Sequence, residues 1–349
     1  MLTAWLATAS GSLAISPILA GSAVSMTTSG DAGTYPRATK LQNGSILGAI
    51  ATTIDSSTKQ LQLFTSRNSG QSWTLTGSAA TRPSSTSDLD NPYPLQLPNG
   101  TLLLAYRNHD KTAEGEYTYY RITLSTSHDN GATWSYLSTP ASEPSGPNGI
   151  WEPFLRNARD GSLQLYYSKL NGSDDQNSIL RTSTDGGATW SEEQIISGVD
   201  VTARDGMLGV AAFPDPDGQE LVAVFESLPV DGTFSVHAIS SPDDGESWGE
   251  RRLVYSAEGE RNNAGSPQVV NVGGRLCVSF MTDEDTRLHE WTKGAGAKML
   301  VSSDGETFEE KTEVFAPEAF WPGMVALNDS ALLYMADYSG AKSQVVRLE

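Results

Sequence analysis

An octet motif repeats along the chain, and its spacing constrains the fold more than any other sequence feature. The pattern is Ser-x-Asp-x-Gly-x-Thr/Ser followed by an aromatic residue, with Asn68 replacing Asp in the first copy and Ser303 replacing it in a degenerate last copy. The copies close, in chain order, at Trp73, Trp134, Trp190, Trp248 and Phe308. The steps between these aromatics are 61, 56, 58 and 60, so a period near 58 divides the 349 residues into six units.

A second repeat has the same period. Each unit has a start residue, usually followed by Pro, then an apolar strand and a tight turn such as Asn43-Gly44 or Asn99-Gly100. Asn-Gly and Asp-Gly between apolar runs are typical of β-hairpins. The start residues are Tyr35, Asn91, Glu152, Gly209, Ser266 and Trp321.

Units of this length, with short strands and a fixed aromatic, are typical of propeller blades. We therefore expect an all-β, six-bladed β-propeller with four-stranded antiparallel blades, in which residues 31–349 form a single domain. The sixth unit has too few residues after Phe320 for four strands. We expect a strand from residues 10–30 to complete it and close the ring.

The N-terminal segment, residues 1–30, has two possible roles. Residues 2–25 are apolar and small, which is typical of a secretory signal, but Lys and Arg are absent before Arg37. Pro17 and several Gly and Ser residues argue against a transmembrane helix. We expect a secreted, extracellular protein without a membrane span, and the alternative is that this segment is an edge strand of the folded domain.

Composition excludes several classes of function. The formal net charge is −19, so the phosphate backbone of nucleic acids would repel the chain. The single cysteine, Cys277, excludes an internal disulfide and a Cys-based zinc site, and the four histidines are scattered. No metal and no organic cofactor is expected, and we expect a monomer.

The repeat indicates which face of the propeller carries a site. The hairpin turns and the octets should share one face, so the strand starts and the ends of the second strands should share the other. The predicted ends are Thr52, Asn108, Lys169, Glu226, Thr282 and Tyr338. Each ring then contains one acid, Glu152 among the starts and Glu226 among the ends.

Two carboxyl groups that face one pocket are what glycoside hydrolysis requires. One must hold a proton, and apolar neighbours such as Trp151 and Phe225 raise a carboxyl pKa; the other must stay ionised. The alternative is that Glu152 and Glu226 are hydrogen-bonded carboxylates at strand ends.

The octets resemble the Asp boxes of sialidase-like propellers, in which the box residues hold a turn. The segments Ile150–Leu155, Phe225–Ser227 and Tyr35–Arg37 resemble the exo-arabinanases of glycoside hydrolase family 93. That resemblance implies a six-bladed propeller that releases arabinobiose from the non-reducing end of linear α-1,5-arabinan with retention. It also implies Glu152 as acid/base and Glu226 as nucleophile.

Other candidates follow from their position near the channel. Arg37 could bind sugar hydroxyls or hold a glutamate ionised, or it could form an ion pair between blades. Tyr338 could orient or tune Glu226. Aromatic residues could stack on sugars or pack in the core, and polar ones could bind hydroxyls or cap turns. These remaining substrate-binding candidates are Tyr35, Trp151, Trp321, Asn91, Asn108, His109, Asn262 and Ser266.

Two other functions compete with an arabinanase. A sialidase needs three arginines around a carboxylate, and only Arg37 and Arg261 are candidates here. A non-catalytic glycan-binding propeller would lack paired acids in its channel. The lack of a third arginine and the strongly acidic composition favour a neutral polysaccharide or oligosaccharide, such as arabinan, as the partner.

Overall fold

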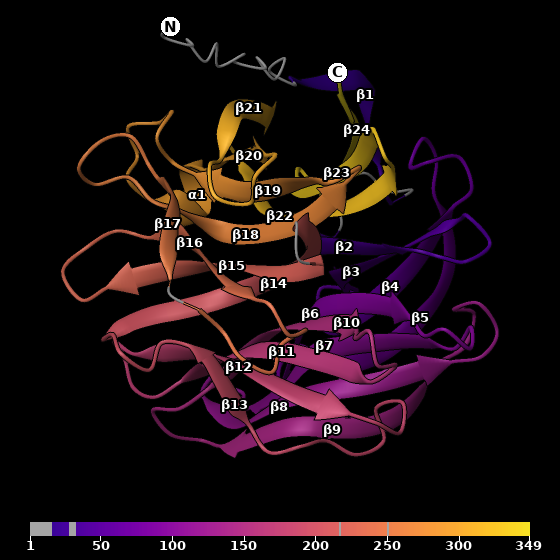
Figure 1. Cartoon of the computed structure of the whole chain (residues 1–349). Coiled ribbons are helices and arrows are strands. Elements are labelled where there is room, and N and C mark those ends of the chain that lie inside the picture. Colours follow the sequence, from indigo (N-terminus) through magenta and orange to yellow (C-terminus); the bar gives the residue numbers. More distant parts are fainter. Residues whose placement is uncertain (1–15, 28–32, 216–217, 250) are drawn as a thin grey trace, which may run out of the picture.

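The structure, a computed structural model, describes residues 16–27, 33–215, 218–249 and 251–349. The regular structure of these residues is almost entirely β-strand, with one four-residue helix, α1 (Trp291–Gly294) (Figure 1). Residues 1–15 and 28–32, on which much of the predicted N-terminal segment falls, lie outside the described residues.

The strands assemble into antiparallel sheets that follow the sequence units. The first sheet is β2 (Thr34–Lys40), β3 (Ile46–Ile54), β4 (Thr58–Ser66) and β5 (Thr74–Pro83). The second is β6 (Ser87–Gln96), β7 (Leu102–Lys111), β8 (Tyr117–Ser127) and β9 (Ser135–Pro144). Two further four-stranded sheets are β18 (Ala264–Val272), β19 (Arg275–Thr282), β20 (Gly296–Ser302), β21 (Glu309–Phe315), and β22 (Ala319–Asn328), β23 (Ala331–Tyr338), β24 (Ala341–Leu348), β1 (Pro17–Ser25).

The third and fourth units share one eight-stranded sheet. It contains β10 (Ile150–Asn157), β11 (Leu163–Leu170), β12 (Gln176–Ser183), β13 (Gln194–Ser197), β14 (Ala203–Asp215), β15 (Gly218–Pro229), β16 (Ser235–Ser241) and β17 (Arg252–Ser256). A parallel bridge between Gln176 and Arg204 joins β12 to β14. The prediction of six four-stranded blades is therefore wrong, because the described residues form four separate four-stranded blades and this one double-sized sheet.

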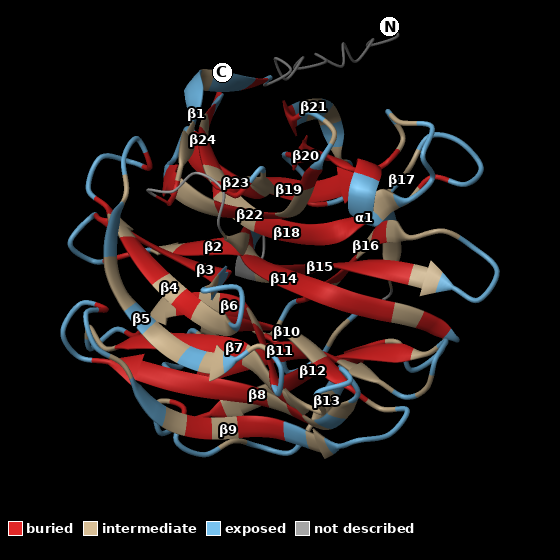
Figure 2. Ribbon diagram, turned by 180° about the vertical axis from the view of Figure 1, so that it is seen from behind, coloured by how far each residue is buried: buried red, intermediate tan, exposed pale blue. Residues whose placement is uncertain are grey.

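The first strands of the units lie at the centre and contact one another in a closed cycle. β2 contacts β6, and the contacts continue through β10, β14, β18 and β22 back to β2. Hydrophobic side chains fill the space between consecutive units, as where Leu47 of β3 and Leu102 of β7 share a cluster. Figure 2 shows buried residues concentrated on the strands and exposed residues in the loops.

The N-terminal strand completes the last sheet, as expected. β1 pairs antiparallel with β24, from Pro17 opposite Leu348 to Ser25 opposite Lys342. The missing strand of the sixth unit therefore comes from the N-terminal segment, as predicted.

The octets form the turns that precede the fourth strands, and their polar groups bond within the turn. In the second unit Ser127 Oγ donates to Asp129 Oδ1 at 2.9 Å, and the Gly131 and Thr133 amides donate to Ser127 and Asp129. Hydrogen bonds from Thr133 lower the pKa of the Asp129 carboxyl to about 2. These groups are committed to holding the turn.

The last octet has a different register from the one predicted. Asp304, not Ser303, accepts the hydroxyl of Ser302 at 3.0 Å, and Thr307 N–H donates to the same Asp304 oxygen at 2.7 Å. The turn is one residue shorter than the others, so alignment on Phe308 displaced its acid by one position.

The fourth strand of one unit lies in close contact with the octet turn of the next, so a substitution there should lower stability. A Cβ on Gly77 of β5 would lie 2.5 Å from the Gly131 carbonyl oxygen and 2.6 Å from that of Ala132. Because backbone must move to relieve these contacts, we expect Gly77→Ala to lower the free energy of unfolding by about 1–3 kcal/mol. Urea denaturation would measure the change. Gly146→Ala, where a Cβ meets nothing within 4 Å, is the matched control, and equal stabilities of the two variants would contradict the prediction.

Candidate active site

Every central strand carries a bulge near its start. Two residues of the strand are skipped by the pairing, and the first of them has a φ between 46° and 54°. Non-glycine residues rarely adopt this left-handed conformation, and such bulges re-aim side chains. The six residues are Tyr35, Asn91, Glu152, Met207, Ser266 and Trp321.

Five of these are the predicted start residues, but the fourth is wrong. Gly209 pairs with Val224 beyond the bulge, and Met207 occupies the equivalent position. The other units have Pro after the bulge residue, whereas this unit has Leu208. Without that proline the sequence alignment shifted by two residues.

The predicted ring of second-strand ends is also shifted. The residues that pair just before the bulges are Ala51, Arg107, Ser168, Glu226, Met281 and Asp337. Only Glu226 was predicted in register. A shift of one residue turns a side chain to the opposite face of a strand, so Asn108, Lys169 and Tyr338 lie on the other face from this ring. The ring also contains a second acid, Asp337, so the expectation of one acid per ring was wrong.

Glu226 is nearly buried, with 8% of its surface exposed. Its Oε2 accepts the backbone N–H of Ser266, the bulge residue of the next unit, at 2.7 Å. Burial raises the pKa of the Glu226 carboxyl to about 8, and the nearby Glu152 charge adds to this, whereas Ser266 and Arg204 oppose it. Glu226 therefore holds a proton at neutral pH.

Glu152 is half-buried and lies in a more polar environment. Burial raises the pKa of its carboxyl above the usual value, although Arg107, a hydrogen bond with Ser168, and Arg204 oppose this shift by favouring the charged form. Two arginines and a hydroxyl stabilise the carboxylate form of Glu152, so Glu152 is more readily ionised than Glu226. Arg204 favours the charged form of both carboxyls, and the charge of Glu152 raises the pKa of Glu226, which places the two acids in one site.

The contact made by Glu226 has equivalents in two other units. The bulge N–H of Met207 donates to Ser168 Oγ at 3.0 Å, and that of Trp321 donates to Met281 Sδ at 3.4 Å. Glu226 thus occupies a position that joins neighbouring units, and this contact fixes its carboxyl against β18. In three units, the residue at this second-strand position therefore accepts the bulge N–H of the next unit, and in one of the three that residue is a glutamate.

The arginine beside the glutamates is not the one expected. Arg37 is buried, its guanidinium lies 3.9 Å from the centre of the Tyr35 ring, and its Nη1 donates to the carbonyls of Pro36 and Trp321 at 2.9 Å. It links the first and last units. Arg107, which was not predicted although it directly precedes the predicted Asn108, pairs with Asp88 at 3.0 Å and with Asp90 at 3.5 Å.

Several predicted side chains of the second and third units pack together below the site. Trp151 lies 5.1 Å from His109, ring centre to ring centre, in a group of aromatic rings. Burial lowers the pKa of His109 to about 3, and its Nδ1 accepts the Arg121 amide at 3.0 Å. Asn108 Nδ2 donates to Thr123 Oγ1 at 3.2 Å. Trp151, His109 and Asn108 therefore pack or bond within the protein.

The remaining candidates lie in three places. Asn91 is a buried bulge residue whose N–H donates to Asp90 Oδ1 at 2.7 Å, close to Arg107. Asn262 lies in the loop before β18 and contacts His289 at 2.9 Å. Tyr338 packs on Phe315, with the ring centres 5.3 Å apart, and not beside Glu226.

Two aromatic residues near Glu226 had no sequence signal. Trp291 of α1 and Phe234, in the loop between β15 and β16, have ring centres 4.7 Å apart. The ring centres of Trp291 and Trp321 are 6.4 Å apart, and those of Trp321 and Tyr35 are 6.5 Å apart. The predicted Tyr35 and Trp321 are therefore part of an aromatic row along one side of the site.

Comparison with solved structures identifies the fold. An α-L-arabinofuranosidase from Fusarium graminearum superposes with a TM-score of 0.70 at 21% identity, over 90% of this chain and 93% of that one. An α-L-arabinanase from Penicillium chrysogenum, solved with arabinobiose, gives 0.70 at 19% identity over 95% and 98% of the two chains. The chain shares the fold of these glycosidases.

More distant matches belong to the same architecture. A sialidase from Streptococcus pneumoniae gives a TM-score of 0.61 at 11% identity, over 95% of this chain and 70% of that one. Neither a protein-family model nor a curated protein matches the sequence. The likeness to the arabinanase and arabinofuranosidase structures thus lies in the fold.

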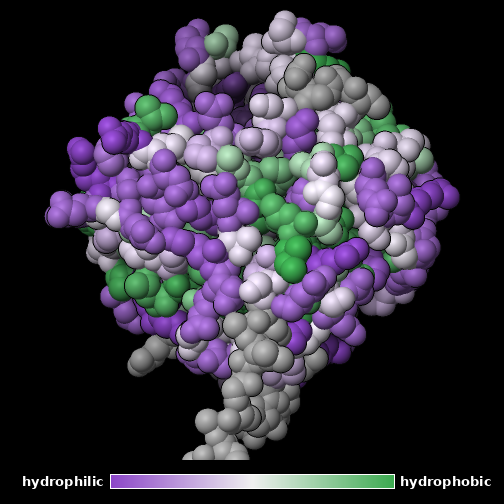
Figure 3. Space-filling view, turned by 90° about the horizontal axis from the view of Figure 1, so that it is seen from above, coloured by the Kyte–Doolittle hydropathy of each residue, from purple (hydrophilic) through white to green (hydrophobic). Residues whose placement is uncertain are grey.

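The described residues also bear on other partners. None of their helices is long and apolar enough to cross a membrane. No group of three or more His, Cys, Asp or Glu side chains among them is placed to hold a metal ion. Figure 3 shows mainly hydrophilic residues on the face seen from above, with a smaller hydrophobic patch near its middle.

Proposed function

We propose that this protein is a secreted glycoside hydrolase that releases arabinobiose from the non-reducing end of linear α-1,5-arabinan with retention. The observation that carries the proposal is the pair Glu152 and Glu226, which share one site and differ in environment. A protonated and an ionised carboxyl are the two groups that hydrolysis of a glycosidic bond needs.

The environments favour roles opposite to those implied by the family resemblance. Glu226, with a pKa of about 8, is the proton donor to the leaving oxygen. Glu152, which Arg107 and Arg204 help to ionise, attacks the anomeric carbon as the glycosidic bond breaks. Glu226 then takes a proton from water, whose oxygen displaces Glu152 and releases the sugar with its original configuration.

A neutral substrate fits the arginines better than a sialoside does. Arg37 is bonded to backbone carbonyls, Arg107 is paired with Asp88 and Asp90, and Arg261 is exposed. A clamp for a substrate carboxylate would need three free guanidinium groups, and among the described residues the site offers only two that are partly free, Arg204 and the Nη2 side of Arg37. Arabinan carries no charge, and the fold neighbour from Penicillium chrysogenum was solved with arabinobiose.

The site of action follows from the substrate. A polysaccharide does not cross a membrane, so an arabinan hydrolase acts outside the cell. We extend the proposal to a monomer, which size-exclusion chromatography would test.

Product analysis tests the proposed activity. Incubation with debranched linear arabinan is expected to yield arabinobiose as the only early product, and proton NMR of the first product is expected to show the α-anomer. Glu152→Gln and Glu226→Gln are expected to slow release by about 10²-fold or more, whereas Glu309→Gln, at an exposed strand residue, keeps wild-type activity. Absence of any release from arabinan, with turnover of a sialoside, would contradict the proposal.

A further inference from the structure

The loop between β19 and β20, residues 283–295, is longer than the corresponding connection in any other unit. It contains α1, in which the Trp291 side chain is half-buried. The Trp291 ring stacks on Phe234, with ring centres 4.7 Å apart and an angle of 28° between the planes. The charged residues beside it, Glu290 and Lys293, pair with each other at 2.6 Å on the surface. The stack therefore fixes the orientation of the indole, and the charges of α1 neutralise each other.

Gly265 shows that this indole lies next to the Glu226 carboxyl. A Cβ on Gly265 would lie 2.7 Å from Glu226 Oε2 and 2.9 Å from Trp291 Cη2. The carboxyl and the indole therefore border one small space above β18. Because Glu226 is only 8% exposed, a ring at this place covers much of what remains of its access to water.

The other elements around Glu226 bring polar or charged groups to it. Ser266 of β18 donates its amide to Oε2 at 2.7 Å, Arg204 of β14 favours the carboxylate form, and Glu152 of β10 disfavours it. The β19–β20 loop brings an apolar ring instead, and such a ring does not solvate a charge. Burial is accordingly the largest influence on the pKa of Glu226.

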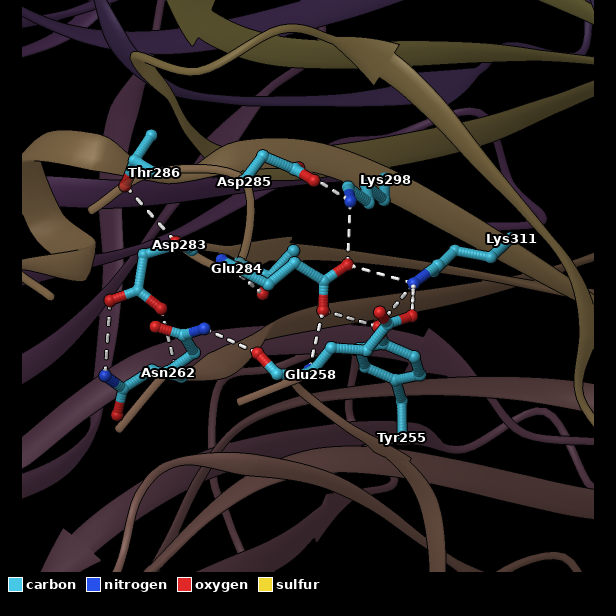
Figure 4. A network of polar contacts seen from close by, with 11 residues as sticks. Tyr255, Glu258, Asn262, Asp283, Glu284, Asp285, Thr286, Lys298 and Lys311 are labelled. Carbon is cyan, nitrogen blue, oxygen red and sulfur yellow. Dashed lines mark hydrogen bonds and ion pairs between the residues drawn. The ribbon is translucent and has the colours of Figure 1, made fainter. Parts of the chain in front are cut away.

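A buried ionic network holds the base of the loop (Figure 4). Glu284, with 3% of its side chain exposed, accepts Lys298 Nζ at 2.7 Å and the Tyr255 hydroxyl at 2.6 Å. Asp283, the preceding residue, accepts the Asn263 amide at 2.7 Å. These bonds join the loop to the fourth unit and to the segment that leads into β18.

Two further contacts hold the parts of the molecule that meet at the indole. His289 Nδ1, in the middle of the loop, lies 2.9 Å from Asn262 Oδ1. Phe234, on which the indole stacks, donates its N–H to Asn263 Oδ1 at 3.0 Å and accepts the N–H of Ala264 at 2.9 Å. The loop and the ring beneath the indole are thus tied to the same short segment before Gly265.

We propose that Trp291 is a fixed cover that keeps water from the Glu226 carboxyl, and that Glu284 is the positioning residue that holds this cover in place. The inference rests on the proposed function only in taking Glu226 as one of the two catalytic carboxyls, and it applies to either role of that group. A cover that excludes water disfavours the charged form of a carboxyl and strengthens its interactions with neighbouring groups. The proton affinity of Glu226 therefore depends on Trp291.

Carbon-13 NMR of protein labelled at the glutamate carboxyls measures this affinity, with the Glu226 signal assigned by its absence in Glu226→Gln. In Trp291→Ala we expect the titration midpoint of Glu226 to fall by about one pH unit or more, because water then stabilises the carboxylate. Trp291→Phe should keep most of the wild-type midpoint. An unchanged midpoint in Trp291→Ala, or a wild-type midpoint near that of an exposed glutamate, would overturn the inference.

Trp190→Ala is the matched control. It also removes a half-buried tryptophan, but one whose Nε1 donates to the Gly187 carbonyl in the octet turn of the third unit. We expect it to lower stability without moving the Glu226 midpoint. An equal fall of the midpoint in both variants would show a general loosening of the protein and would overturn the inference.

The pH profile of kcat/KM on arabinan separates this inference from the proposed function. In Trp291→Ala the limb that belongs to Glu226 should move to lower pH, and this is the alkaline limb for an acid and the acidic limb for a nucleophile. If the NMR midpoint falls but wild type cleaves no arabinan, the cover stands and the proposed function fails. If wild type cleaves arabinan and neither the midpoint nor a limb moves, the cover fails and the proposed function stands.

Two variants test the positioning role of Glu284. Glu284→Gln should move the Glu226 midpoint in the same direction as Trp291→Ala but by less, since the loop is loosened while the indole is retained. Lys311→Met weakens the same network from a more exposed side, because Lys311 Nζ lies 3.1 Å from Glu284 Oε1, and it should have a smaller effect of the same sign. An unchanged Glu226 midpoint in a folded protein of either kind would overturn the assignment of Glu284.

Discussion

Glu226→Gln is expected to lower kcat on arabinan by about 10²- to 10⁴-fold, because the leaving oxygen loses its proton donor. The raised pKa of Glu226, about 8, means that the wild-type acid is protonated below that pH and loses its proton above it. The wild-type rate should therefore fall as the pH rises through about 8, and this alkaline limb should be absent in the variant. A pH profile of kcat/KM for both proteins measures this.

The leaving group provides the control for this variant. A 2,4-dinitrophenyl arabinobioside needs little protonation, so Glu226→Gln should lose far less activity on it than on arabinan. Equal losses on both substrates, or an alkaline limb that persists in the variant, would assign the acid to another residue.

Glu152→Gln is expected to lower turnover of every substrate by more than about 10³-fold, because no carboxylate remains to form the covalent intermediate. A substrate with a better leaving group, such as the dinitrophenyl arabinobioside, should not restore turnover by Glu152→Gln. In the Glu226→Gln protein, the dinitrophenyl substrate should instead accumulate a glycosyl-enzyme, since water lacks its base in the second step.

Mass spectrometry would locate that adduct. The expected result is an arabinobiosyl mass on the peptide that contains Glu152, and none in Glu152→Gln or in the exposed control Glu309→Gln. An adduct on a peptide containing Glu226 would restore the roles that the family resemblance implied.

Sequence reasoning found the propeller units because two independent signals shared one period. The octet turns and the strand starts that precede a proline both depend on local backbone geometry, and short sequence motifs specify such geometry directly. Five bulge residues were located in this way, including Glu152. The fourth, Met207, was missed where Leu208 replaces the proline.

Register and tertiary contacts were harder to predict. Counting eight residues from each hairpin turn displaced five second-strand positions by one, because in those units the strand reaches the ring seven residues after the turn residue. The count gave Glu226 correctly because β14 and β15 pair over a longer stretch, from Gly209 opposite Val224 to Asp215 opposite Gly218. Trp291 lies in a loop without a counterpart in other units, and the bridge from Gln176 to Arg204 that merges two sheets has no motif.

The protonation states of Glu152 and Glu226 also depend on tertiary contacts. Arg107 and Arg204 are ordinary strand residues in the sequence, and only the folded arrangement places them beside Glu152. The order of the two glutamate pKa values therefore emerged from the structure.

The pairing of β1 with β24 has a consequence for how the molecule comes apart. Open arrays of repeats have end units with only one neighbour, and unfolding begins there. Here Gln344 Nε2 donates to the Ala20 carbonyl, 324 positions away along the chain, and β22 packs against β2. Every unit consequently has two neighbours, so loss of any one exposes apolar surface on both sides. We therefore expect the pairing of β1 with β24 to make the series of repeats unfold as one cooperative unit, and not unit by unit from an end.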